Sequence, residues 1–517
     1  MVVVVILAMT CLYMVDATPL HLPMQRSTPN RKMMARAHKG DPVYTRLLQA
    51  NRHGARLNRV AQSTRRRHAS PVVLTGCPFA DFTIPVAIGA STFELLVDTG
   101  SSTLAVAGNN CQSCTGVHPR WQPTSAVSSN QYRGAAGRYG DGSGWRADVW
   151  RDNVRLLTNE SSTTTATHPM IETSMRLAVM NAQTTAYTNA DGSYNPDASP
   201  FFIPDVCADH TDTFMRTVTM QGIIGLGFAG LASSGTDSFS SELFRQHTHI
   251  EPVFAMQMCA NRGSLWIGGF DNQTYSDEPL YTPVTQPTYW SVAPSGVYID
   301  DEPIQVSFTD FTARPSYVNI VDSGTTMWEL PTAVHRKIVD RILQHPAFRR
   351  YFRSAPGNNF FDHSTGWCEA SYHPVTWQEL QRELPTITLQ FVNGLSLTMD
   401  GVGSYMMPCN AAYDQWTPGI GGSEFGMIGG WPLMNQFVVM HDMQAMRIGF
   451  APALGCDKPP LRAMVTIGKP NTSNHHTPGD VVPDLSRAPP TFDATFVCMF
   501  VLQFPLLTLL VLCATYF

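Results

Sequence analysis

A short acidic motif that occurs twice constrains the fold of this 517-residue chain more than any other feature. Its copies span residues 97–103 and 321–327, and each reads an apolar residue, Asp, Thr or Ser, Gly, then Ser or Thr. An apolar-apolar-Gly sequence follows far downstream of each copy, at residues 223–225 and 427–429. Because this two-part pattern repeats as a unit, we predict two lobes of similar structure.

The chemistry of hydrolysis explains why a chain would need two such motifs. Cleaving a peptide bond without a metal or a covalent nucleophile requires one group to take a proton from water while another protonates the carbonyl oxygen. Two aspartates within hydrogen-bonding distance can share one proton, because like charges that close cannot both form cheaply. We therefore predict that Asp98 and Asp322 are a catalytic pair, one acting as base and the other as acid.

The residues beside the two aspartates fit this role. Gly100 and Gly324 let the backbone turn tightly and direct N–H groups at the carboxylates, where a side chain would clash. Ser101 and Thr325 offer hydroxyl groups to the outer carboxylate oxygens. The predicted supporting residues are Thr99, Gly100, Ser101, Ser323, Gly324 and Thr325. Ordinary turns are the competing interpretation, which the matching downstream sequences disfavour.

The middle of the chain, residues 72–452, has the pattern of an all-β protein. Short runs of β-branched and aromatic residues, such as residues 93–97 and 317–321, alternate with Gly, Pro, Asn and Asp. Helical periodicity is confined to short stretches, of which residues 240–246 and 333–343 are the clearest. We therefore predict a large β-protein with a few short helices.

Charge is distributed unevenly along the chain. Residues 18–67 contain 12 Lys and Arg against one acidic residue, and they end in three arginines at residues 65–67. Residues 68–517 hold 23 basic and 38 acidic residues, a net charge of −15, which argues against a nucleic-acid partner. We interpret residues 18–67 as an inhibitory pro-segment that is cut at the arginines. It would be released at low pH, when the carboxylates of residues 68–517 are protonated; a solvated basic linker is the alternative.

Several features indicate export from the cytosol. Residues 1–14 are almost wholly apolar but too few to span a bilayer, and a small residue, Ala17, follows, as in a signal peptide. Of the 11 cysteines, eight lie between the leader and the C-terminal apolar run, an even number that can pair in an oxidising compartment. Glycosylation sequons begin at Asn159, Asn272 and Asn471.

The C-terminal sequence predicts a tether. Residues 458–493 are rich in Pro, Thr, Asn and His, as in an exposed stalk, and residues 494–517 carry no charge. Their length suits a membrane span, but the absence of a following polar segment resembles a GPI-attachment signal, with Ser486 and Ala488 near a candidate ω site. Either anchor would hold a lumenal or extracellular domain at the cell surface or at an endosomal or vacuolar membrane.

Over roughly residues 72–456 the motifs resemble the pepsin-like aspartic protease family. This resemblance implies a bilobal all-β fold with a cleft between the lobes, one catalytic aspartate from each lobe, and a hairpin flap that closes over the substrate. The flap residues would be Tyr139, Gly140 and Asp141, since the tyrosine follows Asp98 by the 41 residues that are typical of the family. A phenol there can cover an apolar substrate while its hydroxyl keeps a hydrogen-bond partner.

The resemblance also implies two disulfides. The surroundings of Cys259 and Cys456 are most similar to the beta-secretase branch, which implies a bridge between them. The Cys368–Cys409 pair matches a bridge that is common across the family.

The disulfide partners of four other cysteines are left open by the sequence. Cys111 and Cys114 resemble an insert of plasmepsin-like and plant-type relatives, and the pairing of these two with Cys77 and Cys207 is undetermined. Zinc binding by Cys111, Cys114 and His118 is the weaker alternative, because no second Cys pair completes a tetrahedral site.

Two departures from the family pattern stand out. Most relatives have Trp seven residues after the first catalytic Asp, whereas this chain has Ala105, which predicts that the flap tyrosine lacks its usual hydrogen-bond donor. Asp322 follows Asp98 by 224 positions, more than the family norm, and the polar residues 158–204 are the expected insert. We expect a surface loop there; a contribution to the cleft rim is the alternative.

The sequence thus predicts a monomeric aspartic endopeptidase that acts on peptides or proteins and uses no cofactor and no metal. A catalytically inactive relative that binds peptides, or a tethered adhesion protein, is the alternative. The predicted segments are a signal peptide (1–17), a pro-segment (18–67), an N-terminal lobe (68–285), a C-terminal lobe (286–457), a stalk (458–493) and a hydrophobic anchor or GPI signal (494–517).

Overall fold

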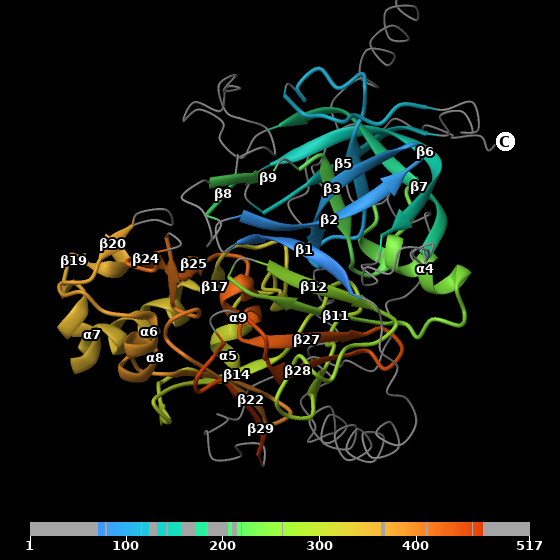
Figure 1. Cartoon of the computed structure of the whole chain (residues 1–517). Coiled ribbons are helices and arrows are strands. Elements are labelled where there is room, and N and C mark those ends of the chain that lie inside the picture. The colour runs from blue at the N-terminus through green and yellow to red at the C-terminus, as the bar shows by residue number, and fades with distance from the viewer. Residues whose placement is uncertain are drawn as a thin grey trace, which may run out of the picture.

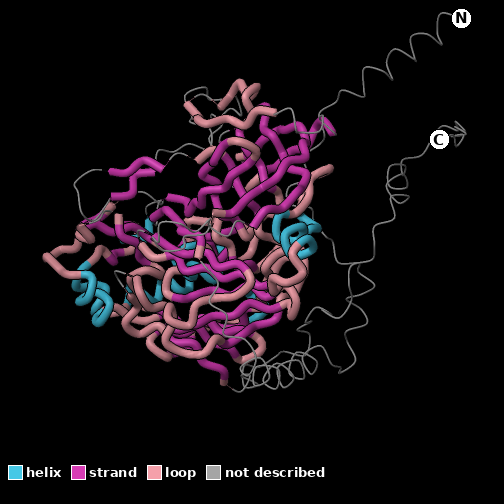
Figure 2. The backbone as a smooth tube through the Cα atoms, turned by 45° about the vertical axis from the view of Figure 1, so that its right-hand side comes forward, coloured by secondary structure: helices cyan, strands magenta, loops and turns pink. Residues whose placement is uncertain are grey.

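The computed structural model describes residues 71–468, apart from 78–79, 115, 124–131, 141–142, 158–170, 185–204, 209–214, 219, 261, 363–367, 410–411 and 457–458. The predicted signal peptide, pro-segment and hydrophobic C-terminal segment therefore lie outside the described residues. Strands predominate in the described part, and the helices are few and short (Figure 2), which confirms the all-β prediction. None of the helices described here is long and apolar enough to cross a membrane.

One large sheet forms most of the first lobe and extends below it (Figure 1). Its strands are β1 (Val72–Cys77), β2 (Ala80–Ile88), β3 (Ser91–Asp98), β4 (Leu104–Ala107), β5 (Tyr132–Arg138), β6 (Gly144–Leu156), β7 (Ile171–Thr184), β10 (Gly222–Gly225), β11 (Val253–Met258), β12 (Arg262–Ile267), β13 (Leu280–Pro283), β27 (Phe437–Asp442) and β28 (Arg447–Pro452). In the described residues their order is β13-β28-β27-β11-β12-β1-β2-β3-β10-β4-β7-β6-β5, and β8 (Asp205–Ala208) pairs separately with β9 (Met215–Val218). Strands β27 and β28 thus join the last part of the chain to strands of the N-terminal half.

The second lobe contains smaller sheets and most of the helices. One sheet has the order β15 (Glu302–Pro303), β14 (Pro294–Ile299), β21 (Ile387–Phe391), β22 (Leu395–Met399), β29 (Met464–Ile467), and another β16 (Ile320–Val321), β26 (Ile428–Gly429), β17 (Trp328–Pro331), β25 (Ile420–Ser423). Short strands are β18 (Ser354–Ala355), β19 (Asn358–Asn359), β20 (Glu369–Ala370), β23 (Met406–Pro408) and β24 (Gln415–Pro418). The helices of this lobe are α5 (Phe308–Phe311), α6 (Thr332–Gln344), α7 (Pro346–Tyr351), α8 (Trp377–Glu383) and α9 (Trp431–Met434), with the 3-10 turn η2 (Phe360–Asp362). Helix α4 (Phe239–Gln246) and the 3-10 turn η1 (Ala229–Leu231) belong to the first lobe.

The two predicted helices form close to their expected bounds. In α6, the side chains of Val334, Ile338 and Ile342 recur at helical spacing and are fully buried. Helix α4 begins after Ser238, whose side chain accepts a hydrogen bond from the backbone N–H of Ser241, as N-cap residues do. Amphipathic spacing therefore accounts for α6, and a side-chain cap defines the start of α4.

The repeated sequence pattern corresponds to a repeated pattern of strand pairing. In the first lobe, β3 runs parallel to β10, so that Asp98 lies opposite Gly225, and β10 is antiparallel to β4. In the second lobe, β16 runs parallel to β26, so that Val321 lies opposite Gly429, and β26 is antiparallel to β17. The downstream apolar-apolar-Gly sequences are thus the strands that support the two aspartate loops.

The expectation of a surface loop across residues 158–204 is wrong for its middle part. Strand β7 lies inside the large sheet, where it is antiparallel to β6 and parallel to β4. Its alternate side chains Thr173, Met175, Leu177 and Val179 are buried, a period-2 pattern that the polar residues between them obscured. The flanking stretches of the predicted insert lie outside the described residues.

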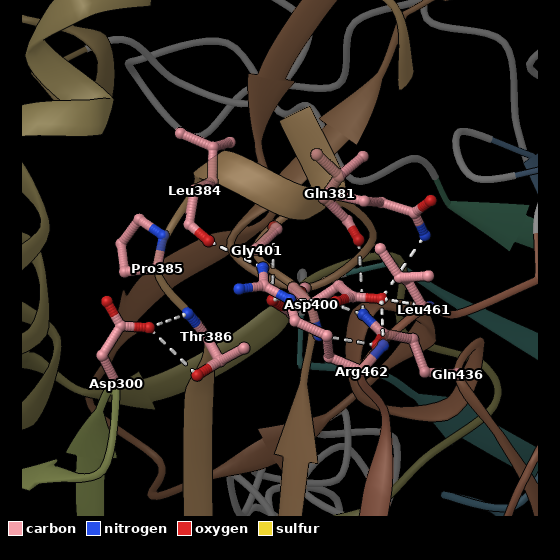
Figure 3. A network of polar contacts seen from close by, with 12 residues as sticks. Asp300, Gln381, Leu384, Pro385, Thr386, Asp400, Gly401, Gln436, Leu461 and Arg462 are labelled. Atoms are coloured by element: carbon pink, nitrogen blue, oxygen red, sulfur yellow. Dashed lines mark hydrogen bonds and ion pairs between the residues drawn. The ribbon is translucent and has the colours of Figure 1, made fainter. Parts of the chain in front are cut away.

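The structure also differs from the expected stalk at its N-terminal end, because residues 459–468 are bound to the second lobe. Strand β29 pairs antiparallel with β22, and just before it Arg462 Nε lies 3.1 Å from Oδ1 of the fully buried Asp400 (Figure 3). The N–H of Leu461 donates to Asp400 Oδ2 at 2.6 Å, and Arg462 Nη2 donates to the carbonyl of Leu384 at 2.7 Å. A buried carboxylate needs such partners, which the sequence places 61 and 62 positions away.

Candidate active site

The two aspartate loops are joined by four hydrogen bonds that cross between the lobes. The Thr99 hydroxyl donates to the carbonyl of Val321 (3.0 Å) and accepts from the N–H of Ser323 (2.9 Å). Reciprocally, the Ser323 hydroxyl donates to the carbonyl of Val97 (2.7 Å) and accepts from the N–H of Thr99 (3.1 Å). All four bonds are buried, so that they fix the two loops relative to each other.

Each motif glycine contacts both carboxylates. The N–H of Gly100 donates to Asp98 Oδ1 at 2.7 Å, and the N–H of Gly324 donates to Asp322 Oδ1 at 2.9 Å. A Cβ atom added to Gly100 would lie 2.6 Å from Asp322 Oδ2, and one added to Gly324 would lie 2.6 Å from Asp98 Oδ1. The carboxylate of each lobe therefore packs against the glycine of the other, which brings the two acids into one site.

Burial and the neighbouring carboxyl oppose ionisation of Asp98. Asp98 is 4% exposed and Asp322 is 9% exposed. Burial raises the pKa of Asp98 well above its usual value, and the neighbouring Asp322 raises it further. The geometry thus favours a state in which Asp98 holds a proton.

The two outer hydroxyl groups behave differently. The Thr325 hydroxyl donates to Asp322 Oδ2 at 2.7 Å, so both oxygens of that carboxylate accept a hydrogen bond from its own loop. The Ser101 hydroxyl is buried and completes no well-formed hydrogen bond to any described residue. It lies near enough to Asp98 to favour the charged carboxylate, but this effect is smaller than that of burial.

The segment expected to form a flap is an antiparallel hairpin. Strands β5 and β6 pair with Arg138 opposite Gly144, and the N–H of Tyr139 donates to the carbonyl of Ser143 at 2.9 Å. Tyr139 is half-buried, and the turn at Gly140 is exposed with open space around its Cα. The third expected flap residue, Asp141, lies outside the described residues.

The expectation that the flap tyrosine lacks a donor is wrong. Trp145, on β6, donates from its indole Nε1 to Tyr139 Oη at 2.9 Å. Trp145 and Ala105 belong to one buried apolar cluster, and Tyr139 packs against it. The ring of Trp145 covers Gly137, directly opposite it in the hairpin, where any Cβ atom would clash. The sequence places Gly137 and Trp145 on opposite sides of the expected hairpin turn, and pairing them across that hairpin would have revealed this donor.

Three disulfides are present in the described part of the chain. They are Cys259–Cys456 and Cys368–Cys409, the two pairs that the family resemblance implied, and Cys111–Cys114. The side chains of Cys77 and Cys207 lie outside the described residues. Because the sulfurs of Cys111 and Cys114 are bonded to each other, these residues are not thiolate ligands for zinc.

Comparison with known proteins identifies the family. A family model described as eukaryotic aspartyl protease matches residues 81–183 and 205–453, most of the chain, so this protein belongs to the eukaryotic aspartyl protease family. It is 26% identical to an aspartic protease of Phaffia rhodozyma over 373 residues, which cover 72% of this chain and 76% of that protein. It is 24% identical to a beta-secretase of Strongylocentrotus purpuratus over 419 residues (73% and 67%), and 25% identical to a gastricsin of Cavia porcellus over 242 residues (45% and 54%).

Proposed function

We propose that this chain is an aspartic endopeptidase that hydrolyses peptide bonds with Asp98 and Asp322. The observation that carries the proposal is the crossed packing of the two carboxylates, each against the glycine of the other loop, which is close enough for Asp322 to raise the pKa of Asp98. Membership of the family supports a peptidase in general. The specific assignment of the catalytic pair rests on this geometry and on the chemistry of a shared proton.

The environments of the two carboxyls suggest their roles. Asp98, whose pKa is raised by burial and by Asp322, holds the shared proton and donates it to the scissile carbonyl oxygen. Asp322, oriented by hydrogen bonds from Gly324 and Thr325, accepts a proton from the attacking water. The roles exchange as the tetrahedral intermediate collapses. Asp322 gives the proton it gained to the leaving amine as the C–N bond breaks, and Asp98 takes a proton back from a hydroxyl of the intermediate, which restores the starting state.

The flap hairpin supplies the cover over the substrate. Tyr139 packs against a cluster that includes Leu96 and Ile223, whose strands β3 and β10 carry the Asp98 loop. A flap that closes there would exclude water from the carboxyl pair and strengthen every electrostatic interaction within the site.

The protein would follow the secretory route as a tethered zymogen. The three disulfides among the described residues support folding in an oxidising compartment, as the apolar residues 1–14 predict. The basic residues 18–67 would cover the acidic catalytic body until low pH weakens their attraction. Unchanged maturation at neutral and acidic pH after mutation of Arg65 to Arg67 would argue against this mechanism.

A direct assay tests the proposed activity. The full-length protein, purified in detergent and acidified to allow maturation, should cleave unstructured peptides in a reaction that pepstatin inhibits. Asp98→Asn and Asp322→Asn should each abolish the cleavage while leaving the fold unchanged by circular dichroism. Peptide binding without turnover in the wild-type protein would instead support the alternative of an inactive peptide-binding relative.

A further inference from the structure

Glu329 occupies a position in the second lobe that corresponds to Ala105 in the first. Glu329 follows Asp322 by seven residues, as Ala105 follows Asp98. Counted from the two aspartates, the strand pairing agrees with this spacing. Glu329 on β17 lies opposite Ile428, which also pairs with Ile320, two residues before Asp322. Ala105 on β4 lies opposite Ile223, which also pairs with Leu96, two residues before Asp98. The structural repeat therefore makes the two positions equivalent.

Strand register places Glu329 on the sheet face that carries the catalytic aspartate. Ile428 is paired on one side with Glu329 and on the other with Ile320, and paired residues project from the same face of a sheet. Asp322 follows Ile320 by two residues along the chain and shares this face. The neighbours of Glu329 on β17, Trp328 and Leu330, project the other way and are fully buried.

The first lobe indicates which part of the protein lies against this face of the sheet. Ala105 and its partner Ile223 belong to the cluster against which Tyr139 of the flap packs, next to the Asp98 loop. Because the two lobes repeat, the face that carries Glu329 is expected to border the Asp322 loop in the same way. Glu329 is half-buried there, and its neighbour on β25 is a glycine, Gly421.

Glu329 has no cationic partner among the described residues. None of the ion pairs in the described part of the chain includes its carboxyl group, and the nearby hydroxyl of Ser423 only partly opposes the rise of its pKa. Burial raises the pKa of Glu329, and the negative charge of Asp322 contributes to the shift, which reflects how near the two carboxyls lie. A partly desolvated carboxylate of this kind is costly unless a cation joins it.

The surroundings of Glu329 leave room for an incoming side chain. A Cβ atom added to Gly421 would approach only Met327, whose methyl carbon would lie 3.4 Å away. Met327 and Ile428 are themselves half-buried, so an apolar surface borders the acid. A long side chain with an apolar stem and a cationic end, as in Lys and Arg, matches that combination of surface and charge.

We propose that Glu329 makes this enzyme prefer substrates with a Lys or Arg side chain close to the scissile bond, bound on the Asp322 side. The proposal rests on the proposed endopeptidase function and names its substrate class. The cationic group would pair with Glu329 while its methylenes lie on Met327 and Ile428. Ala105, at the equivalent place in the first lobe, has no charge to offer, so the preference is confined to one side of the catalytic pair.

The test compares paired peptides on the full-length matured protein. Quenched fluorescent peptides of one parent sequence would carry Lys, Gln or Glu at each of the three positions on either side of the cleaved bond. We expect kcat/KM for Lys to exceed that for Gln about tenfold at one position, the size of effect expected for a hydrogen bond to a charged group. Glu329→Gln should reduce this ratio to about one, and Glu329→Lys should make Glu the preferred residue.

Two controls separate this inference from the proposed function. Glu278→Gln removes an equal charge from an exposed site that precedes β13 and should leave the Lys-to-Gln ratio unchanged. Cleavage of all peptides with no charge preference, or a preference that persists in Glu329→Gln, would overturn the role of Glu329 while the endopeptidase remains. Absence of cleavage of every peptide by the wild-type protein would overturn the proposed function itself.

Discussion

The loops around Asp98 and Asp322 have the same backbone arrangement but hold their carboxylates differently. In both loops the aspartate lies at the end of a strand that pairs in parallel with a downstream strand, and a glycine N–H donates to its Oδ1. Thr325 adds a second hydrogen bond to Asp322, whereas the corresponding hydroxyl of Ser101 completes none of good geometry. Two nearly identical frames therefore produce one well-oriented carboxylate and one whose ionisation is resisted mainly by burial.

This difference teaches how a duplicated fold makes unlike acids. The repeat supplies a similar backbone arrangement, and in the proposed mechanism single side chains divide the roles of acid and base. The same applies one strand further on, where Ala105 and Glu329 occupy equivalent positions with opposite polarity. The predictions below test this division in order of expected effect.

Removing either carboxylate should have the largest effect on activity. Asp98→Asn and Asp322→Asn should each lower kcat by about 10³–10⁴-fold, since each removes one partner of the proton exchange. The double variant should be no worse than either single variant, because the pair acts as a unit. Single-turnover cleavage of a peptide checks this, and losses that multiply in the double variant would show that the two acids act independently.

Adding a methyl group to either motif glycine should be the next most damaging change. Gly100→Ala and Gly324→Ala retain the N–H donor but place a Cβ atom 2.6 Å from the carboxylate of the opposite lobe. We expect kcat to fall about 100-fold in both, the effect of displacing a catalytic group by about 1 Å. Gly230→Ala is the matched control, because its added Cβ would meet nothing within 4 Å. Full activity in either motif variant would contradict the crossed packing.

The two outer hydroxyls should differ in their contribution to catalysis. Thr325→Ala should lower kcat about tenfold, because it removes a 2.7 Å hydrogen bond to a charged oxygen. Ser101→Ala should change kcat by less than about twofold, since that hydroxyl completes no well-formed bond. Steady-state kinetics at several pH values would measure both. Equal losses would remove the asymmetry between the loops.

Removing the hydrogen-bond donor to Tyr139 should have a smaller effect on activity. Trp145→Phe removes the 2.9 Å hydrogen bond to Tyr139 and should lower kcat/KM about threefold to fivefold, as loss of a bond between neutral groups does. Tyr139→Phe should cause a similar loss, and the double variant should add little to it. Trp150→Phe, on the same strand β6, is the control. Losses that simply multiply would show that the two side chains are not coupled.

The raised pKa of Asp98 predicts a modest effect on stability. A carboxyl whose pKa is higher in the folded than in the unfolded state stabilises the fold at low pH, and this contribution is lost as pH rises through the folded-state pKa. Asp98→Asn has no such ionisation, so its Tm relative to the wild type should increase by about 2–4 °C between acidic and neutral pH. Thermal denaturation across this range checks the sign, and a relative Tm that falls with pH would contradict it.

The features that the sequence predicted well depend on short-range patterns. The repeated motifs, the β-rich middle of the chain and helices α4 and α6 all follow from residues adjacent in sequence or at one helical or strand period. The strands that support the aspartate loops also correspond to a short sequence pattern, the apolar-apolar-Gly sequences at residues 223–225 and 427–429. The sequence did not reveal that they pair in parallel with the aspartate strands.

The features that the sequence did not predict depend on pairing between distant residues or between strands. Strand β7 carries polar residues between its buried ones, and its place in the sheet depends on β4 and β6. The bond from Trp145 to Tyr139 depends on the register of a hairpin, and the comparison with family residues directed attention to Ala105 instead. Glu329 gained a role only when strand register placed it on the face of Asp322.

The attachment of β29 to the second lobe fixes where the remaining chain departs from the globular body. Figure 1 shows β29 at one end of the molecule and β5 and β6 at the other. The contact between Arg462 and the buried Asp400 holds this end of the described chain against the second lobe. If residues beyond 468 secure the protein to a surface, the second lobe would face that surface, and the distance of the Asp98 and Asp322 pair from it would depend on the dimensions of the folded body.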